Sequence, residues 1–169
     1  MRKGHAATAS ALFFAVAPGM VAGVIPWLIT RWEMRQPFAH WPPFRLIGAA
    51  LILVGIPVLI HAFVRFVRDG SGTPAPVAPT VHLVVGGLYR YVRNVMYLAV
   101  LSTIVGQACL LGQGTLLVYA AVIALFFALF VRLYEEPTLA RRFGAEYEAY
   151  RQAVPGWRPR LRPWSPNGR

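Results

Sequence analysis

The feature that most constrains the fold is a run of 36 residues, from Met96 to Val131, without a charged side chain. A single helix of that length would measure about 54 Å, whereas the hydrocarbon core of a bilayer is about 30 Å thick. Gly112-Gln-Gly114 divides the run into halves of 16 and 17 residues, and glycine favours a turn there. The run therefore predicts two membrane-spanning helices joined as a tight hairpin.

Two further apolar segments precede this run. Residues 4–30 carry no charge; this segment is too long for a signal peptide and lacks a small-residue cleavage site, so it reads as an uncleaved first span, bent at Pro18 and Pro26. Residues 46–64 form a second span with Pro57 in its interior. The sequence therefore predicts an all-α integral membrane protein with about four transmembrane helices, built as a single domain over residues 1–169.

Composition agrees with this fold class. Hydrophobic residues make up 57% of the chain and charged residues 14%, with a mean hydropathy of +0.51, which is too apolar for an ordinary soluble domain. The net charge of +11 does not indicate nucleic acid as a partner, because the arginines flank apolar spans and form no continuous patch. Cys109 is the only cysteine and supports neither a disulfide framework nor a metal site.

The distribution of lysine and arginine predicts the orientation. With the N-terminus inside, fourteen of these residues fall on the inner side and three, all between Arg31 and Arg45, on the outer side. The positive-inside rule then places both termini in the cytoplasm. His61, Arg65 and Arg68 follow the second span at helical spacing, which suits either a functional basic face or arginines that snorkel to the interface.

Proline and glycine mark the connections between these spans. Residues 31–45 form a loop rich in proline and aromatic residues, and residues 69–80 are an extended surface segment. After Glu136, Pro137 suits the first turn of a new helix. That helix is amphipathic, with one stripe formed by Leu139, Phe143, Tyr147 and Tyr150. We expect it to lie along the membrane or to fold back over a site.

Two charged elements lie on either side of the long apolar run. Gly87–Tyr97, GLYRYVRNVMY, precedes it, with Arg90 and Arg93 three apart and so on one face of a helical turn. Glu135 and Glu136 follow it. Adjacent carboxylates at the end of an apolar helix repel each other and lose hydration, which requires an offsetting cation unless the helix end lies in water.

The candidate cations are Arg132, the Arg90 and Arg93 face, and a cationic ligand. We therefore predict that the two elements meet at the membrane surface and form one polar site. Simpler roles exist for some members: Asn94 can cap the following helix through its side chain, and Tyr89, Tyr91 and Tyr97 can be interfacial anchors.

Together these elements resemble the isoprenylcysteine carboxyl methyltransferase and phospholipid methyltransferase superfamily. Its first motif, G-x-Y-x-x-x-R-H-P-x-Y, is matched at Gly87, Tyr89, Arg93 and Tyr97. Its second motif, after the hairpin, is matched at Glu135, Glu136, Leu139, Phe143, Gly144, Tyr147, Tyr150, Val154 and Pro159. The resemblance covers about residues 70 to 160, and the segment before Tyr89 is similar to bacterial members.

The resemblance implies an integral membrane methyltransferase of the bacterial inner membrane, which transfers a methyl group from S-adenosylmethionine to a lipophilic or amphipathic acceptor. S-adenosylhomocysteine is then the product. It implies a cofactor site between the two motifs at the cytoplasmic face. Arg93 and Asn94 are the candidate catalytic residues, and the candidate cofactor-binding residues are Tyr89, Arg93, Asn94, Tyr97, Glu135, Glu136 and Tyr147.

The chain departs from the family motif at one place. Asn94-Val95 stands where the family has His-Pro, and an asparagine cannot carry a proton or a charge. The alternative is therefore a degenerate member that binds a lipid or a partner protein without catalysis. A small transporter is a weaker alternative, since Cys109 is the only titratable residue deep in a span. Prenylated cysteine, a phospholipid amine and a small thiol all stay open as acceptors.

Overall fold

The computed structural model describes residues 16–37, 40–70 and 81–165. Within these residues the secondary structure is helical, with no strand, as the sequence predicts. The elements in chain order are η1 (Met20–Val24), α2 (Ile25–Thr30), α3 (Pro42–Gly70), η2 (Gly87–Arg90), α4 (Val95–Leu111), α5 (Gly114–Phe130), η3 (Val131–Glu135), α6 (Glu136–Phe143) and α7 (Ala145–Ala153). The parts of the predicted first span before Val16, of the 69–80 segment after Gly70, and of the tail after Ser165 lie outside the described residues.

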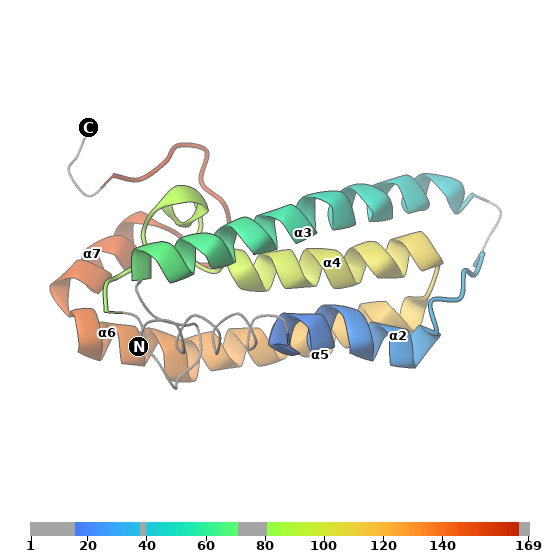
Figure 1. Cartoon of the computed structure of the whole chain (residues 1–169), viewed down its shortest axis with the longest axis horizontal. Coiled ribbons are helices and arrows are strands. Elements are labelled where there is room, and N and C mark those ends of the chain that lie inside the picture. Colours follow the sequence, from blue (N-terminus) through green and yellow to red (C-terminus); the bar gives the residue numbers. More distant parts are fainter. Residues whose placement is uncertain (1–15, 38–39, 71–80, 166–169) are drawn as a thin grey trace, which may run out of the picture.

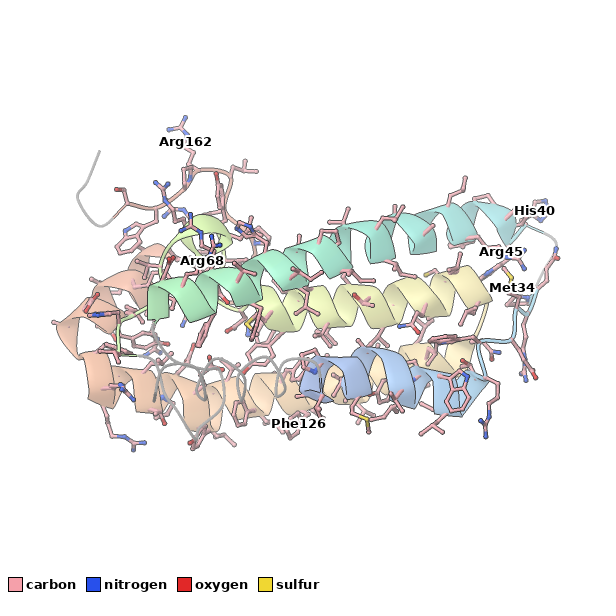
Figure 2. The ribbon with its side chains drawn as sticks, viewed as in Figure 1. Met34, His40, Arg45, Arg68, Phe126 and Arg162 are labelled. Atoms are coloured by element: carbon pink, nitrogen blue, oxygen red, sulfur yellow. The ribbon has the colours of Figure 1, made fainter. Side chains whose placement is uncertain are left out.

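Two of the described helices are long and apolar enough to cross a membrane. They are Pro42–Phe66 and the continuous helix Gly114–Phe143, while Val16–Thr30 and Val95–Leu111 are apolar but shorter. Only 22% and 17% of the most apolar windows of the two long helices are buried. A core helix of a soluble protein would be mostly buried, so these outward apolar faces indicate membrane association. Figure 2 shows Phe126 on the outer side of α5 and Arg45 and Arg162 at opposite ends of the molecule.

The long helices lie side by side along the long axis of the molecule (Figure 1). α4 runs between α3 and α5, α2 lies beside α5, and α6 and α7 stand at one end. α3 and α4 approach closely because both carry glycine at the crossing. A Cβ on Gly48 would lie 2.5 Å from the Gly106 carbonyl oxygen, and one on Gly106 would lie 2.8 Å from the Gly48 carbonyl oxygen. Small residues commonly permit such close packing between apolar helices.

Pro26 breaks the backbone hydrogen bonding of the first helix, and a neighbouring helix compensates. Proline lacks the N–H that would bond to the carbonyl of Ala22, and the turn there widens into η1. The Gln107 side chain on α4 donates to the Ala22 carbonyl at 2.6 Å, and Tyr119 donates to the Val21 carbonyl at 2.8 Å. Side chains of α4 and α5 thus satisfy carbonyls of the turn before Pro26.

α3 is longer than the predicted second span. It begins at Pro42, inside the segment predicted as a loop, and continues through Asp69 and Gly70, which were predicted to be extended. Proline is well placed in a first turn, where its missing N–H has no intrahelical partner. Pro57 lies inside α3 without ending it. The prediction was wrong at both boundaries because charge and proline were read as ends of the helix.

The long apolar run forms two helices, with α4 ending at Leu111 and α5 beginning at Gly114. Gly112 has a left-handed conformation with φ of 66°, which glycine adopts without strain. α5 then continues through η3 into α6, so Pro137 does not begin a separate helix. The predicted single amphipathic helix is wrong, since Gly144, with φ of 52° and ψ of −125°, separates α6 from α7.

Candidate functional site

The two charged elements meet around one cavity of about 80 Å³ at the end of the bundle that carries α6 and α7. Six of the seven predicted site residues line it. The seventh, Tyr97, donates a hydrogen bond to Glu135, which is one of the six. The lining residues are Phe66, Leu83, Val84, Tyr89, Arg93, Asn94, Val131, Glu135, Glu136, Leu139, Tyr147 and Tyr150. Residues of the two elements, about forty positions apart in the sequence, therefore lie together at this cavity.

The backbone at Arg93 and Asn94 is held by the segment that follows α7. The Arg93 N–H donates to the Pro155 carbonyl at 3.0 Å, and the Asn94 N–H donates to the Gly156 carbonyl at 3.1 Å. Farther along, the Trp164 N–H donates to the Arg90 carbonyl at 3.0 Å. We call residues 155–164 the strap, because they run along the backbone of the first motif and fix its position.

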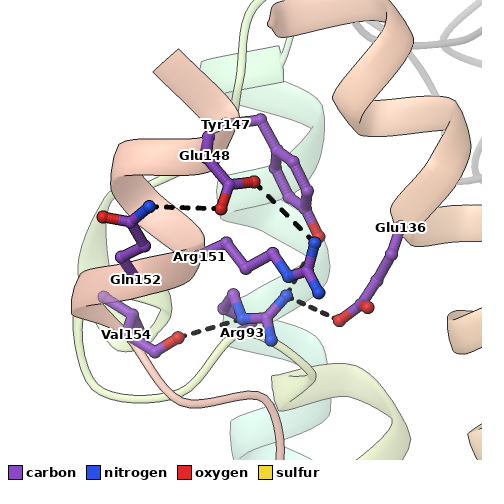
Figure 3. Close-up of polar contacts among 7 residues, drawn as sticks. All are labelled: Arg93, Glu136, Tyr147, Glu148, Arg151, Gln152 and Val154. Carbon is purple, nitrogen blue, oxygen red and sulfur yellow. Dashed lines mark hydrogen bonds and ion pairs between the residues drawn. The ribbon is translucent and has the colours of Figure 1, made fainter. Parts of the chain in front are cut away.

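The Arg93 guanidinium joins four segments of the chain (Figure 3). Its Nη1 donates to Glu136 at 2.8 Å and to the Tyr147 hydroxyl at 2.9 Å, and its Nε donates to the Val154 carbonyl at 2.9 Å. The Arg93 and Glu136 side chains are only 13% and 20% exposed, so this ion pair is weakly screened by water. Arg93 is the cation that offsets Glu136, as one of the sequence alternatives proposed.

The other candidate cations do not take this role. Arg90 was expected to share a face with Arg93, but its Nε donates to the Trp164 carbonyl at 2.6 Å, outside the cavity. The 3₁₀ turn of η2 ends at Arg90 and the chain changes direction before α4, which separates the two arginines. Arg132 is exposed and forms no ion pair with a described residue.

Glu135 has a different environment from Glu136. It accepts a hydrogen bond of 2.7 Å from the Tyr97 hydroxyl and forms no ion pair with any described residue. Both glutamates line the cavity although they are adjacent in sequence, and the wide turn of η3 ends at Glu135. Wide turns of this kind often occur at functional sites. Within the described lining, two carboxylates face one guanidinium, which suits a cationic ligand.

Asn94 is buried, with 6% of its surface exposed, and its Nδ2 finds no hydrogen-bond partner among the described residues. Its side chain does not cap α4, contrary to the prediction. A capping side chain needs an extended backbone, whereas Asn94 has φ of −96° and ψ of 46°. A buried amide without a partner is costly, and Asn94 is one of the residues that line the cavity.

Tyr89, Tyr147 and Tyr150 are buried, which argues against simple interfacial anchoring for Tyr89. Tyr89 is 6% exposed and donates to the Ala62 carbonyl of α3 at 3.4 Å, while Tyr150 donates to the Tyr89 carbonyl at 2.7 Å. Burial raises the pKa of Tyr89 and of Tyr150 above the usual value for a phenol. Both hydroxyls are therefore protonated donors.

Sequence reasoning missed three contributors: Tyr150, Gly156 and the carbonyl of Val154. Tyr150 could have been found, since it lies on the same stripe as Tyr147. Gly156 could not, because its role is to bring bare backbone close to the site. A Cβ there would lie 3.2 Å from Arg93 Nη2 and 3.4 Å from Asn94 Nδ2.

Comparison with known proteins supplies a family. The family model described as phospholipid methyltransferase matches residues 44–146, which include α3, the first motif, α4, α5 and both glutamates. No curated protein and no solved structure matches the chain. Because the matched region covers more than half of the sequence, the chain belongs to the phospholipid methyltransferase family.

Proposed function

We propose that the protein is a membrane methyltransferase that uses S-adenosylmethionine and acts on a lipophilic acceptor. The observation that carries this proposal is the meeting of both family motifs at one cavity. There, within the described part of the chain, the lining contains two carboxylates, one arginine and an amide whose Nδ2 has no hydrogen-bond partner. The family supports methyl transfer in general. The use of this cofactor, the acceptor and the roles of individual residues are part of the proposal.

The residues of the cavity fit such a cofactor. When bound, S-adenosylmethionine supplies a methyl group on a positively charged sulfonium. Glu135, which has a neutral phenol as its partner, can face that charge or accept from a ribose hydroxyl. The Nδ2 of Asn94, which has no hydrogen-bond partner among the described residues, can donate to the cofactor carboxylate. The rings of Tyr89, Tyr97 and Tyr147 can contact the adenine or the sulfonium.

Arg93 has a supporting role in this proposal. Its guanidinium already contacts Glu136, Tyr147 and the Val154 carbonyl, so we infer that it positions Glu136 and closes the site. The cavity of about 80 Å³ is smaller than the roughly 300 Å³ of the smallest typical ligand sites. Binding of a whole cofactor therefore requires the cavity to widen.

Methyl transfer needs alignment of the acceptor more than it needs an acid or a base. The chain must therefore supply binding, orientation and a dry environment. The apolar outer faces of α3 and α5 suit delivery of the acceptor from the bilayer. We propose four membrane crossings, the last two as a hairpin of α4 and α5, with both termini and the cavity on the cytoplasmic side, as the arginine distribution favours.

Methyl transfer can be tested with membranes that contain the protein and S-adenosylmethionine labelled in its methyl group. We expect label in the lipid extract with the wild type and a loss of at least about tenfold with Glu136→Ala. Arg132→Ala is the matched control, since Arg132 lies on the same long helix, is exposed and forms no ion pair with a described residue. Equal labelling with the wild type and Glu136→Ala would refute the proposal.

A second candidate, binding without catalysis, is favoured by Asn94 and Val95 at the position of the family His-Pro. Val95 is 3% exposed and packs with Tyr89 and Val92, so it serves the fold as an apolar residue. If the protein lacks activity for want of these family residues, Asn94→His with Val95→Pro should create labelling that the wild type lacks. If the protein is a binding protein, the double substitution should leave the lipid extract unlabelled.

A further inference from the structure

α3 carries His61 and Arg65 one turn apart, and both side chains lie over the Gly86–Gly87 backbone. A Cβ on Gly87 would lie 3.0 Å from His61 Nε2 and 3.2 Å from Arg65 Nε. Gly87 has φ of 58°, which other residues rarely adopt. An imidazole and a guanidinium thus converge on one point of bare backbone.

This point lies at the end of an apolar span. The candidate membrane span of α3 is Pro42–Phe66, so His61 and Arg65 lie near its end. In a bilayer this is the depth at which an apolar helix meets the lipid head groups. His61 is exposed, and the Arg65 side chain is 44% exposed.

The same turn of α3 borders the cavity. Phe66, next to Arg65, lines the cavity, as do Val84 and Tyr89 beneath it. The Tyr89 hydroxyl donates to the carbonyl of Ala62, next to His61, at 3.4 Å. A group held by His61 and Arg65 would therefore stand at the rim of the cavity.

The His61 and Arg65 side chains can still donate hydrogen bonds to an anion. Arg65 pairs with Asp69 at 3.3 Å, through Nη1, and a pair this exposed contributes little and gives way easily. No hydrogen bond or ion pair within the described residues engages the His61 ring. Arginine with an imidazole supplies several N–H donors, which suit the oxygens of a phosphate better than a single ammonium would.

We propose that His61 and Arg65 bind the phosphate of a lipid whose head group reaches into the cavity. The proposal rests on the proposed function, and it assigns these residues to orientation of the acceptor. In a head group the phosphate lies only a few bonds from the terminal nucleophile. Fixing the phosphate at the rim would place that nucleophile among the residues of the cavity, where alignment matters most.

The test uses protein purified in an uncharged maltoside detergent and native mass spectrometry to measure lipid retention. The probes are dioleoyl phosphatidylethanolamine and dioleoylglycerol, which share acyl chains and differ in the phosphate head group. We expect the wild type to retain the phospholipid at least about tenfold more tightly. His61→Gln with Arg65→Gln should reduce this preference to less than about twofold, whereas Arg65→Lys alone should keep only part of it, because an ammonium keeps the charge but lacks the planar set of N–H donors.

Arg68→Gln is the matched control, because it removes one exposed arginine from the same helix outside the converging pair. An inorganic phosphate competition arm distinguishes the sources: displacement at low millimolar phosphate assigns the site to soluble phosphates, and persistence assigns it to lipid. Equal retention of both lipids, or an unchanged preference in the double variant, overturns the proposal. Binding of S-adenosylhomocysteine is measured separately, so failure of this site is distinguishable from failure of the proposed function.

Discussion

Arg93 and Glu136 form an ion pair of 2.8 Å between positions 43 residues apart in the sequence. The pair connects the start of α4 to the start of α6, and Tyr147 on α7 shares the same guanidinium nitrogen. A contact this well enclosed affects both the stability of the fold and the shape of the cavity. The two effects can be separated by substitution.

Arg93→Met and Glu136→Leu should each destabilise the protein, because each leaves the other side chain charged and largely buried. We expect either change to lower the free energy of unfolding by about 2 kcal/mol, which is less than the loss for a fully buried pair. The double variant should be more stable than either single variant, since no unpaired charge is left. Thermal unfolding in detergent measures the stabilities. Binding of S-adenosylhomocysteine should stay weak in all three, and recovery of binding in the double variant would show that the pair acts only on stability.

Glu135→Gln should discriminate between the cofactor and its product. Glu135 is the carboxylate without a cationic partner among the described residues, and S-adenosylmethionine carries one more positive charge than S-adenosylhomocysteine. We therefore expect the substitution to weaken the binding of S-adenosylmethionine at least about fivefold more than the binding of S-adenosylhomocysteine. Titration calorimetry with both ligands measures the ratio. An unchanged ratio would mean that Glu135 does not face the sulfonium.

Tyr97→Phe provides the companion variant. It removes the 2.7 Å hydrogen bond to Glu135 but keeps the carboxylate and the ring, which packs on Phe127 with centroids 4.6 Å apart. The preference for the charged ligand should therefore be retained. If Tyr97→Phe abolished it as fully as Glu135→Gln, the position of the carboxylate and not its charge would be decisive.

Gly156→Val should disturb the site without replacing a charged residue. Its side chain would press on Arg93 Nη2 and Asn94 Nδ2, 3.2 and 3.4 Å from the new Cβ. We expect affinity for S-adenosylhomocysteine to fall by at least about tenfold. Gly114→Ala is the matched control, since nothing lies within 4 Å of a Cβ there. Equal affinities of the Gly156→Val and Gly114→Ala proteins would exclude a role for the strap.

Gln107→Leu tests the packing of the first helix independently of the site. The substitution leaves the Ala22 carbonyl, which Pro26 already deprives of its backbone donor, without the 2.6 Å hydrogen bond from Gln107. We expect a loss of about 1 kcal/mol, typical of hydrogen bonds between apolar helices, and a lower unfolding temperature. Ligand affinity should not change, because Gln107 does not line the cavity.

Much of the fold could be predicted because it follows from local chemistry. Apolar runs, the glycine at 112 and the prolines specify helices and turns through their own backbone preferences. The boundaries of α3 were wrong because Pro42 begins a helix as readily as proline ends one. The break at Gly144 was missed because a periodic stripe continues across it, and periodicity does not reveal a change of direction.

Some residues of the site could likewise be predicted from the sequence, and others could not. The glutamates and Arg93 could be predicted because a carboxylate pair at the end of an apolar helix requires a cation. The strap could not, since it contributes backbone carbonyls and N–H groups to its hydrogen bonds with residues 90–94, and nearly every residue possesses these groups. Asn94 shows the limit most clearly: its type suited a cap, but its backbone conformation directs the residue to the cavity.

The most direct measurement is a calorimetric titration of S-adenosylhomocysteine into the purified protein in detergent, with Glu136→Ala, Arg93→Ala and Arg132→Ala measured in parallel. We predict saturable binding by the wild type and by Arg132→Ala, and affinity at least about tenfold weaker in the other two variants. Superimposable titration curves for all four proteins, or no heat of binding in the wild type, would contradict the assignment of the cavity as a cofactor site.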